Sequence, residues 1–317
     1  MKVTFLGSSD LGAVTLRKLA ESHHKVVLVV TIPDRPKGRG RRIEPEIVKM
    51  VAEEFGIPVI QPPSIKDPSA FQRILDAASD IIAVASYGEY IPSRIFEIPP
   101  FKSVNVHPSL LPRWRGASPV RYALLEGDPV TGVTIQYVDK KMDAGDILLQ
   151  AETEIDPDED HGELSERLYK MGASLLIQAL DALEKGEIVP IKQDESLVTM
   201  APKIGKDDVW LDFSQPAFKV RNRIRAFSPS PGARALFRNL DFKILKASRE
   251  LQPFYEGSKP GEIVALLADG PVVACADASI LLERLQAAGK SVISGKDFLN
   301  GFRPNIGEAF EGKPLEE

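Results

Sequence analysis

The chain has 317 residues, of which 43% are hydrophobic and 27% are charged, with a formal net charge of −5 and one cysteine. This length and composition suit two globular domains, each large enough to bury a core. One cysteine excludes an intrachain disulfide, and no apolar run approaches the roughly 20 residues that a membrane-spanning helix requires. Because a strand begins at Lys2 with no signal or transit sequence before it, a cytoplasmic location is expected.

The first half of the chain alternates apolar runs with helical patterns. The apolar runs predict strands at 2–7, 25–31, 80–88, 103–109 and 132–138. Helices are predicted at 45–55, 68–78 and 161–186, and after Ser9 or Asp10, either of which can cap the first helix. This rhythm predicts a Rossmann-like, mostly parallel α/β sheet with helices on both of its faces.

The pattern changes after the long helix. Residues 188–205 show no helical period and are expected to connect two domains. Short strands with intervening turns follow at 242–248, 261–267, 271–276 and 279–285, and they predict a small C-terminal β-barrel of the OB type. We therefore expect a first domain over 1–189, a linker over 190–205 and a second domain over 206–317.

Two local zones are basic although the whole chain is acidic. Residues 34–42 hold five basic side chains and one acid, and residues 203–249 hold eleven basic side chains and four acids. Such zones are either solvated surface or contacts for a polyanion, and charge alone leaves both interpretations open.

The segment 105–116, with the sequence NVHPSLLPRWRG, carries the strongest chemical signal. Side chains two apart share one face of a strand, so Asn105 and His107 point the same way at the C-terminal end of a predicted strand. In open α/β sheets this is where ligands bind. A carboxamide can donate to a developing oxyanion, and an imidazole can donate to it or carry a proton.

A carboxylate beside His107 would orient it and favour its charged form. Asp139, Asp143 and Asp146 follow the strand 132–138 directly, and this pattern does not choose among them.

Other motifs are missing. Residues 7–12 (GSSDLG) fit neither a dinucleotide-binding fingerprint nor a P-loop, no G-x-S-x-G elbow occurs, and no ligand spacing points to a metal, so none is expected.

The sequence NVHPSLLPRWRGASP at 105–119, together with MDAGD at 142–146, resembles the folate-dependent formyltransferases. The resemblance covers nearly the whole chain and implies 10-formyltetrahydrofolate as co-substrate, with no metal. By motif it implies Asn105, His107 and Asp143 as the catalytic residues. It also implies folate contacts from the two segments around 86–92 and 109–112 and from the loop after 138, namely Ser86, Tyr87, Gly88, Ile91, Ser109, Leu110, Leu111, Pro112 and Asp139.

Within this family, two features are similar to the members that act on charged initiator tRNA. The basic stretch 31–42 resembles the loop that enters the acceptor end of the tRNA, and Arg39 falls at its key arginine. The C-terminal region, with IRAFSPSPGA at 224–233, resembles the barrel of those members. The implied tRNA contacts are Arg35, Lys37, Arg39, Arg41, Arg42, Lys219, Arg221, Arg223 and Arg225. A monomer is expected.

Two departures and three alternatives accompany this interpretation. Gly-Ser-Ser-Asp at 7–10 replaces the more usual Gly-Thr-Pro-Asp, and Pro108 stands where the tRNA-acting members often have Gly. The first alternative is formyl transfer to a sugar nucleotide or another small amine, and the second is hydrolysis of the folate with water as acceptor. The third, a non-enzymatic RNA-binding protein, would explain the basic zones but not the Asn105, His107 and Asp143 set.

Overall fold

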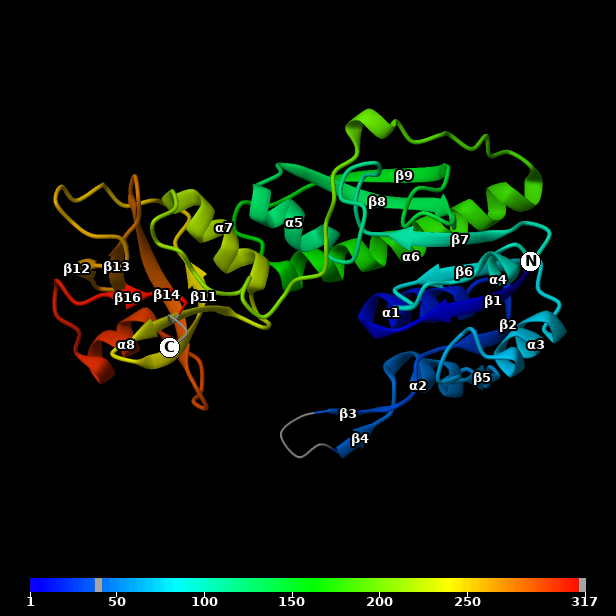
Figure 1. The fold of residues 1–317 in the computed structure, drawn as a ribbon, viewed down its shortest axis with the longest axis horizontal. Coiled ribbons are helices and arrows are strands. Elements are labelled where there is room, and N and C mark those ends of the chain that lie inside the picture. The colour runs from blue at the N-terminus through cyan, green and yellow to red at the C-terminus, as the bar shows by residue number, and fades with distance from the viewer. Residues whose placement is uncertain (38–41, 314–317) are drawn as a thin grey trace. The chain divides into compact units, whose positions relative to one another are not determined.

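The computed structural model describes residues 1–37 and 42–313 (Figure 1). The strands are β1 Lys2–Gly7, β2 Lys25–Val30, β3 Arg35–Lys37, β4 Arg42–Glu44, β5 Val59–Ile60, β6 Ile81–Ala85, β7 Ser103–His107, β8 Val130–Tyr137, β9 Ile147–Glu154, β10 Ala233–Phe237, β11 Leu240–Ala247, β12 Ile263–Leu267, β13 Gly270–Ala274, β14 Ser279–Ala287, β15 Ile293–Ser294 and β16 Phe310–Glu311. The helices are α1 Ser9–Ala20, α2 Ile47–Glu54, α3 Pro68–Asp76, α4 Ser93–Phe96, α5 Pro119–Glu126, α6 His161–Lys185, the 3-10 turn η1 Glu195–Leu197, α7 Ala217–Phe227 and α8 Gly295–Phe302.

The chain forms two compact units, and each is assembled from three stretches of sequence. The first unit holds residues 1–116, 131–153 and 166–200. The second unit holds residues 117–130, 154–165 and 201–317. Helix α6 therefore begins in the second unit and runs on into the first, and α5 belongs with the C-terminal part of the chain.

The first unit is built on a sheet with the strand order β5-β2-β1-β6-β7-β8-β9. Strands β5, β2, β1, β6 and β7 pair in parallel, and β8 pairs antiparallel with β7. This mostly parallel sheet with intervening helices confirms the predicted Rossmann-like fold.

Helices cover both faces of this sheet because its strands are apolar on both sides. On one face, Leu6, Ile82 and Val84 pack with Ile74 of α3 and Ile95 of α4 in one buried cluster. On the other face, a Cβ placed on Gly172 of α6 would lie 2.7 Å from Val106 of β7. Since Val106 faces α6, its neighbours Asn105 and His107 face the opposite side of the sheet.

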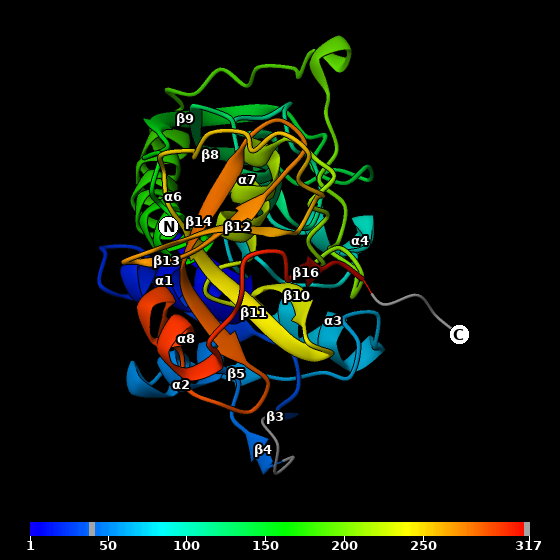
Figure 2. The same ribbon diagram turned by 90° about the vertical axis from the view of Figure 1, so that its left-hand side faces the viewer.

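The second unit is a curled antiparallel sheet with the order β12-β13-β14-β11-β10-β16 and with β15 paired to β14; its long strands β11 and β14 run diagonally across Figure 2. Four mutually packed phenylalanines fill its core: Phe237, Phe242, Phe298 and Phe310. The core also holds Cys275, whose thiol pKa burial raises to about 12. The curled sheet confirms the expected OB-like domain.

Several local predictions need correction. Ser9 is the first residue of α1, and Ser8 occupies the N-cap position without a side-chain capping bond because its hydroxyl donates to the carbonyl of Ser86 instead. Helix α5, strand β9 and the β3–β4 hairpin were not predicted. Residues 190–200 also lie against the first unit, where Ile191 pairs with Ile147 and Met200 pairs with Arg115. No helix within the described residues is long and apolar enough to cross a membrane.

Candidate active site

Strand β7 presents the two side chains that the sequence singled out. Asn105 pairs with Val84 of β6 on one side and with Gln136 of β8 on the other, and His107 pairs with Thr134. His107 is 4% exposed and Asn105 is half-buried. Within the described residues the Asn105 carboxamide has no hydrogen-bond partner, so its N–H groups are available to a ligand.

The two ring nitrogens of His107 have different partners. Nε2 lies 2.9 Å from the carbonyl oxygen of Trp114, and Nδ1 lies 3.7 Å from Oδ1 of Asp143. A carbonyl oxygen can only accept, so Nε2 carries a hydrogen whether the ring is neutral or charged. Nδ1, on the side of Asp143, is therefore the nitrogen that can gain or lose a proton.

Asp143 is the carboxylate that the fold brings to His107. Its Oδ2 accepts from the backbone N–H of Gly116 at 2.9 Å, and its Oδ1 accepts from Nε2 of Gln136 at 3.1 Å. Its backbone has φ 52°, a left-handed conformation that aspartate tolerates better than most residues. Among the described residues, neither Asp139 nor Asp146 forms an ion pair with His107; Asp139 is exposed and accepts from the N–H of Lys141.

The loop that carries Asp143 is closed at its base. The N–H of Tyr137 donates to the carbonyl of Asp146 at 3.0 Å, and Gly145 packs directly against this closure. A Cβ on Gly145 would lie 1.8 Å from the Tyr137 carbonyl oxygen, so no other residue fits there without moving the loop.

The segment 109–112 is fixed by side chains of β8 and β9. The hydroxyl of Thr134 donates to the carbonyl of Ser109 at 2.7 Å and accepts from the N–H of Leu111 at 3.0 Å. Gln150 Nε2 donates to the Leu111 carbonyl at 2.9 Å, and the Leu111–Pro112 bond is cis. Sequence reasoning missed Thr134 and Gln150 because their strand positions carry no motif.

The predicted folate contacts at 86–91 divide into two kinds. Ser86 and Gly88 are exposed and both have positive φ, and the Ser86 carbonyl accepts from the Ser8 hydroxyl. Tyr87 and Ile91 belong to the buried core cluster, and burial raises the pKa of the Tyr87 hydroxyl. Within the described residues that hydroxyl has no hydrogen-bond partner.

The first basic zone lies on the β3–β4 hairpin, which projects from the first unit (Figure 1). Arg35 is exposed, the side chains of Lys37 and Arg42 are not described, and Arg39 and Arg41 lie outside the described residues. Asp34 holds the base of the hairpin by accepting from the N–H of Glu46 at 3.0 Å and by pairing with Lys49 at 2.7 Å. Its hydrogen bonds, that from Lys49 foremost, lower the pKa of Asp34 to about 2.

The cations of α7 have more varied surroundings. Lys219 is exposed, and Arg223 donates to the carbonyl of Asp208. Arg221 is 8% exposed and donates to the carbonyls of Ser248 and Pro157, and it pairs with Asp158 at 2.8 Å.

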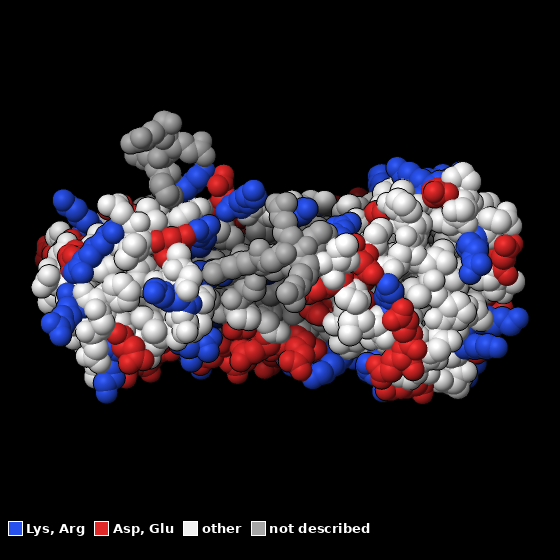
Figure 3. All heavy atoms as spheres, turned by 90° about the horizontal axis from the view of Figure 1, so that it is seen from below, with Lys and Arg blue, Asp and Glu red and all other residues white. Residues whose placement is uncertain are grey.

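Arg225 on the same helix face is also engaged inside the second unit. It donates to the carbonyls of Asp156 and Pro157 at 3.1 and 2.8 Å. Burial, and then the charge of Arg221, lower its pKa to about 10. The space-filling view accordingly shows Lys and Arg interspersed with Asp and Glu over the face that it presents (Figure 3).

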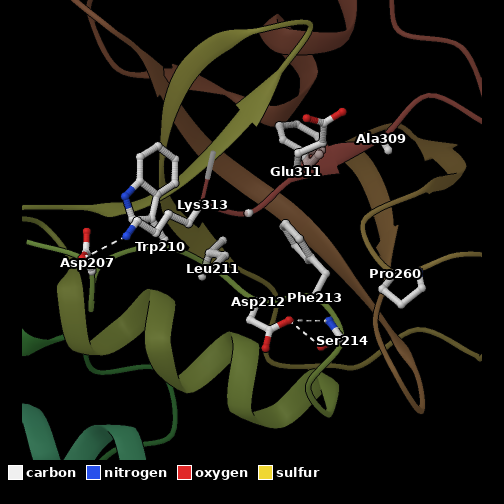
Figure 4. Close-up of a pocket in the computed structure, with 12 residues that line it drawn as sticks. Asp207, Trp210, Leu211, Asp212, Phe213, Ser214, Pro260, Ala309, Glu311 and Lys313 are labelled. Atoms are coloured by element: carbon white, nitrogen blue, oxygen red, sulfur yellow. Dashed lines mark hydrogen bonds and ion pairs between the residues drawn. The ribbon is translucent and has the colours of Figure 1, made fainter. Parts of the chain in front are cut away.

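Two other polar features lie away from this site. His23, His24 and Asp181 form the one group of potential metal ligands found among the described residues, and the N-terminal ammonium lies 3.2 Å from His24 Nδ1. The second unit has a hollow of about 540 Å³ (Figure 4), where Asp212 and Glu311 line the opening near Trp210. Acidic groups at this opening disfavour a phosphate ligand there.

The comparisons with known proteins match most of the chain. Residues 1–180 match the family described as formyl transferase, and residues 203–303 match its C-terminal domain. The chain is 42% identical to methionyl-tRNA formyltransferase of Citrifermentans bemidjiense over 96% of this chain and 94% of that protein. It is 40% identical to the protein of the same name from Natranaerobius thermophilus, over 95% and 97%.

A solved structure has the same fold at lower identity. The N-formyltransferase from Helicobacter canadensis, in complex with folinic acid and dTDP-3-aminofucose, superposes with a TM-score of 0.68 at 18% identity and covers 90% of this chain and 99% of that one. With both domains matched and full-length relatives at about 40% identity, the chain belongs to the formyl transferase family.

Proposed function

We propose that this protein transfers the formyl group of 10-formyltetrahydrofolate to the α-amino group of methionyl initiator tRNA. The observation that carries the chemistry is the convergence of Asn105, His107 and Asp143 at the end of β7. The choice of acceptor rests on relatives named methionyl-tRNA formyltransferase, which match almost the whole chain.

The mechanism is direct transfer. The amine nitrogen attacks the formyl carbon, the carbon–N10 bond of the folate breaks, and N10 takes up a proton as the amine loses one. The free N–H groups of Asn105 stabilise the oxyanion that forms at the formyl oxygen. His107, held by the Trp114 carbonyl at Nε2, carries a proton at Nδ1, and Asp143 stabilises that imidazolium.

We also propose how the chain divides into domains. The catalytic domain spans 1–189, the linker 190–205 and the tRNA-binding domain 206–317. The folate lies against the exposed residues Ser86 and Gly88 and against the segment 109–112, with Asp139 at its border. The β3–β4 hairpin approaches the acceptor end of the tRNA. The protein works in the cytoplasm as a monomer. Size-exclusion chromatography with light scattering tests the monomeric state.

The deciding experiment measures formyl transfer from 10-formyltetrahydrofolate to methionine-charged initiator tRNA. Methionine-charged elongator tRNA and a dTDP-amino sugar serve as alternative acceptors. Asp143→Asn should lower turnover by at least about 10²-fold, the lower end for an acid–base group, with little change in substrate binding. Transfer to the amino sugar alone would replace the proposed acceptor, and unchanged turnover in Asp143→Asn would refute the catalytic assignment.

A further inference from the structure

The chain that leaves α6 returns to the edge of the candidate active site. Ile191 and Ile147 exchange two backbone hydrogen bonds of 2.8 and 2.9 Å, and the N–H of Arg115 donates to the Thr199 carbonyl at 2.9 Å. Between these two attachments lies Gln193. It has no place in the motifs that identified Asn105, His107 and Asp143.

The carboxamide of Gln193 is fully engaged. Its Nε2 lies 2.8 Å from the carbonyl oxygens of both Asp143 and Gly145 and 3.1 Å from Oε1 of Gln136. Its Oε1 accepts from Nε of Arg115 at 3.0 Å. Both carbonyls can only accept and the guanidinium can only donate, so these partners allow one orientation of the amide.

These bonds continue to the carboxylate. Gln136 is 1% exposed, accepts from Gln193 at Oε1 and donates through Nε2 to Oδ1 of Asp143 at 3.1 Å. That oxygen is the one that lies 3.7 Å from His107 Nδ1. Every bond from Arg115 through Gln193 and Gln136 to Asp143 therefore points the same way, with each donor polarised by the one before it.

The buried start of this chain of bonds is a permanent cation. The side chain of Arg115 is 5% exposed, and it also pairs with Glu195, which is 69% exposed, at 2.9 Å. The last of these bonds, from Gln136 to Oδ1 of Asp143, holds that oxygen toward His107. Gln193 also binds the carbonyls of residues 143 and 145, so it fixes the backbone of the loop as well as the carboxylate.

We propose that Gln193, acting through Gln136, is a positioning residue that orients the Asp143 carboxylate toward Nδ1 of His107 for proton transfer. This role rests on the proposed formyl transfer for its kinetic consequence. Its structural consequence, the state of the Asp143 carboxylate, is independent of which amine is formylated.

The test uses Gln193→Met and Gln136→Met in the full-length protein, because methionine keeps the volume and removes the donors. Each variant should lower kcat by about tenfold or more, with both KM values within about twofold of the parent, because misplaced groups cost rate rather than binding. Glu195→Gln, which changes only the exposed partner of Arg115, is the matched control and should behave like the parent.

Two further measurements separate positioning from general loss of structure. In an Asp143→Asn background, Gln193→Met should change kcat by less than about twofold, because the carboxylate it serves is gone. The ¹³Cγ chemical shift of Asp143, measured by NMR at one fixed pH, should differ from that of the parent in both methionine variants, because the hydrogen bond to its Oδ1 is lost or misplaced. The variants break different links, so misfolding of one leaves the other informative.

The outcomes are distinct. Parent-like kcat and a parent-like ¹³Cγ chemical shift of Asp143 in both variants would overturn the positioning role while leaving the formyl transfer intact. A full additional loss of kcat in the Asp143→Asn background would overturn it too. If the parent fails to formylate methionyl initiator tRNA, the proposed function fails, and the chemical shift of Asp143 still decides whether Gln193 positions the carboxylate.

Discussion

The two basic zones of this protein are alike in composition but differ in their surroundings. In the first zone, the described cations belong to the paired strands β3 and β4, which Asp34 anchors at their base, and Arg35 is exposed. On α7, Arg221 and Arg225 donate hydrogen bonds to carbonyl oxygens of the segment 156–159, and Arg221 also pairs with Asp158. A cluster of basic residues in a sequence can therefore form a surface for a partner, or it can form hydrogen bonds and ion pairs within the fold. Solvent exposure and hydrogen-bond partners distinguish the two.

The largest expected effect concerns Arg221, whose side chain is hydrogen-bonded inside the second unit. Arg221→Ala removes the donor to the Ser248 carbonyl and to Asp158 and one of the two donors to the Pro157 carbonyl, so the free energy of unfolding should fall by about 2–4 kcal/mol. Urea unfolding measures this, with comparison of the slopes as a check. Lys219→Ala on the exposed side of the same helix is the control and should change stability by less than about 0.5 kcal/mol. Equal, small effects would make both residues surface cations.

The second-largest effect concerns the protonation of His161 in the second unit. Burial, and then the charge of Arg121, lower the pKa of His161 to about 3. The folded-state pKa lies below the unfolded value near 6.5, so the unfolded chain binds more protons and stability falls as the pH drops through 6.5. From these values the loss at pH 5 is about 2 kcal/mol.

This loss should be absent in His161→Gln. Urea unfolding of parent and variant at pH 8 and pH 5 measures it. If the two proteins lose stability equally between these pH values, His161 is not the group that resists the added charge.

The hairpin should show its role in catalysis rather than in stability. Arg39→Ala should lower kcat/KM for charged initiator tRNA by about tenfold, because a misplaced amine costs rate, and should leave 10-formyltetrahydrofolate binding unchanged. Steady-state kinetics and folate titration measure the two effects. Arg73→Ala, an exposed arginine on α3, is the control. An equal loss in both variants would point to overall charge instead of the hairpin.

The smallest effect concerns Lys219, which is exposed, and Arg223, which is partly exposed and donates to the Asp208 carbonyl. Lys219→Ala with Arg223→Ala should raise KM for tRNA slightly and flatten the slope of log KM against log salt by about one to two, one for each lost phosphate contact. Kinetics over a salt series give this slope. An unchanged slope would mean that neither residue contacts a phosphate and that the two zones differ even more than proposed.

Much of the fold could be predicted from local patterns, because the buried strands and the long helix have clear periods. The paired orientation of Asn105 and His107 followed from strand alternation alone. The choice among Asp139, Asp143 and Asp146 was not available from the pattern, because it depends on how Gly145 and the Tyr137–Asp146 bond fold the loop. The positions of Thr134, Gln136 and Gln193 likewise follow from tertiary pairing and carry no local signal.

The burial of certain charged and aromatic residues could not be predicted from the sequence either. Spacing predicted that Arg221 and Arg225 share a helix face, and they do, but spacing does not say whether that face is exposed. Tyr87 and Ile91 were expected at a ligand and belong to the core cluster, because alternate residues after β6 turn inward. The β3–β4 hairpin has too few apolar residues to be read as a pair of strands.

The core of the second unit gives the protein a practical advantage for spectroscopy. Cys275 is the one cysteine of the chain, is 2% exposed, and has a thiol pKa raised to about 12 by burial. At neutral pH its reactive thiolate is therefore about 10⁻⁵ of the population. A cysteine introduced at an exposed position such as Arg35 could be labelled with a maleimide dye almost without background. A fluorescent reporter on the hairpin would then follow the approach of RNA in real time, with no need to remove the native thiol from the core.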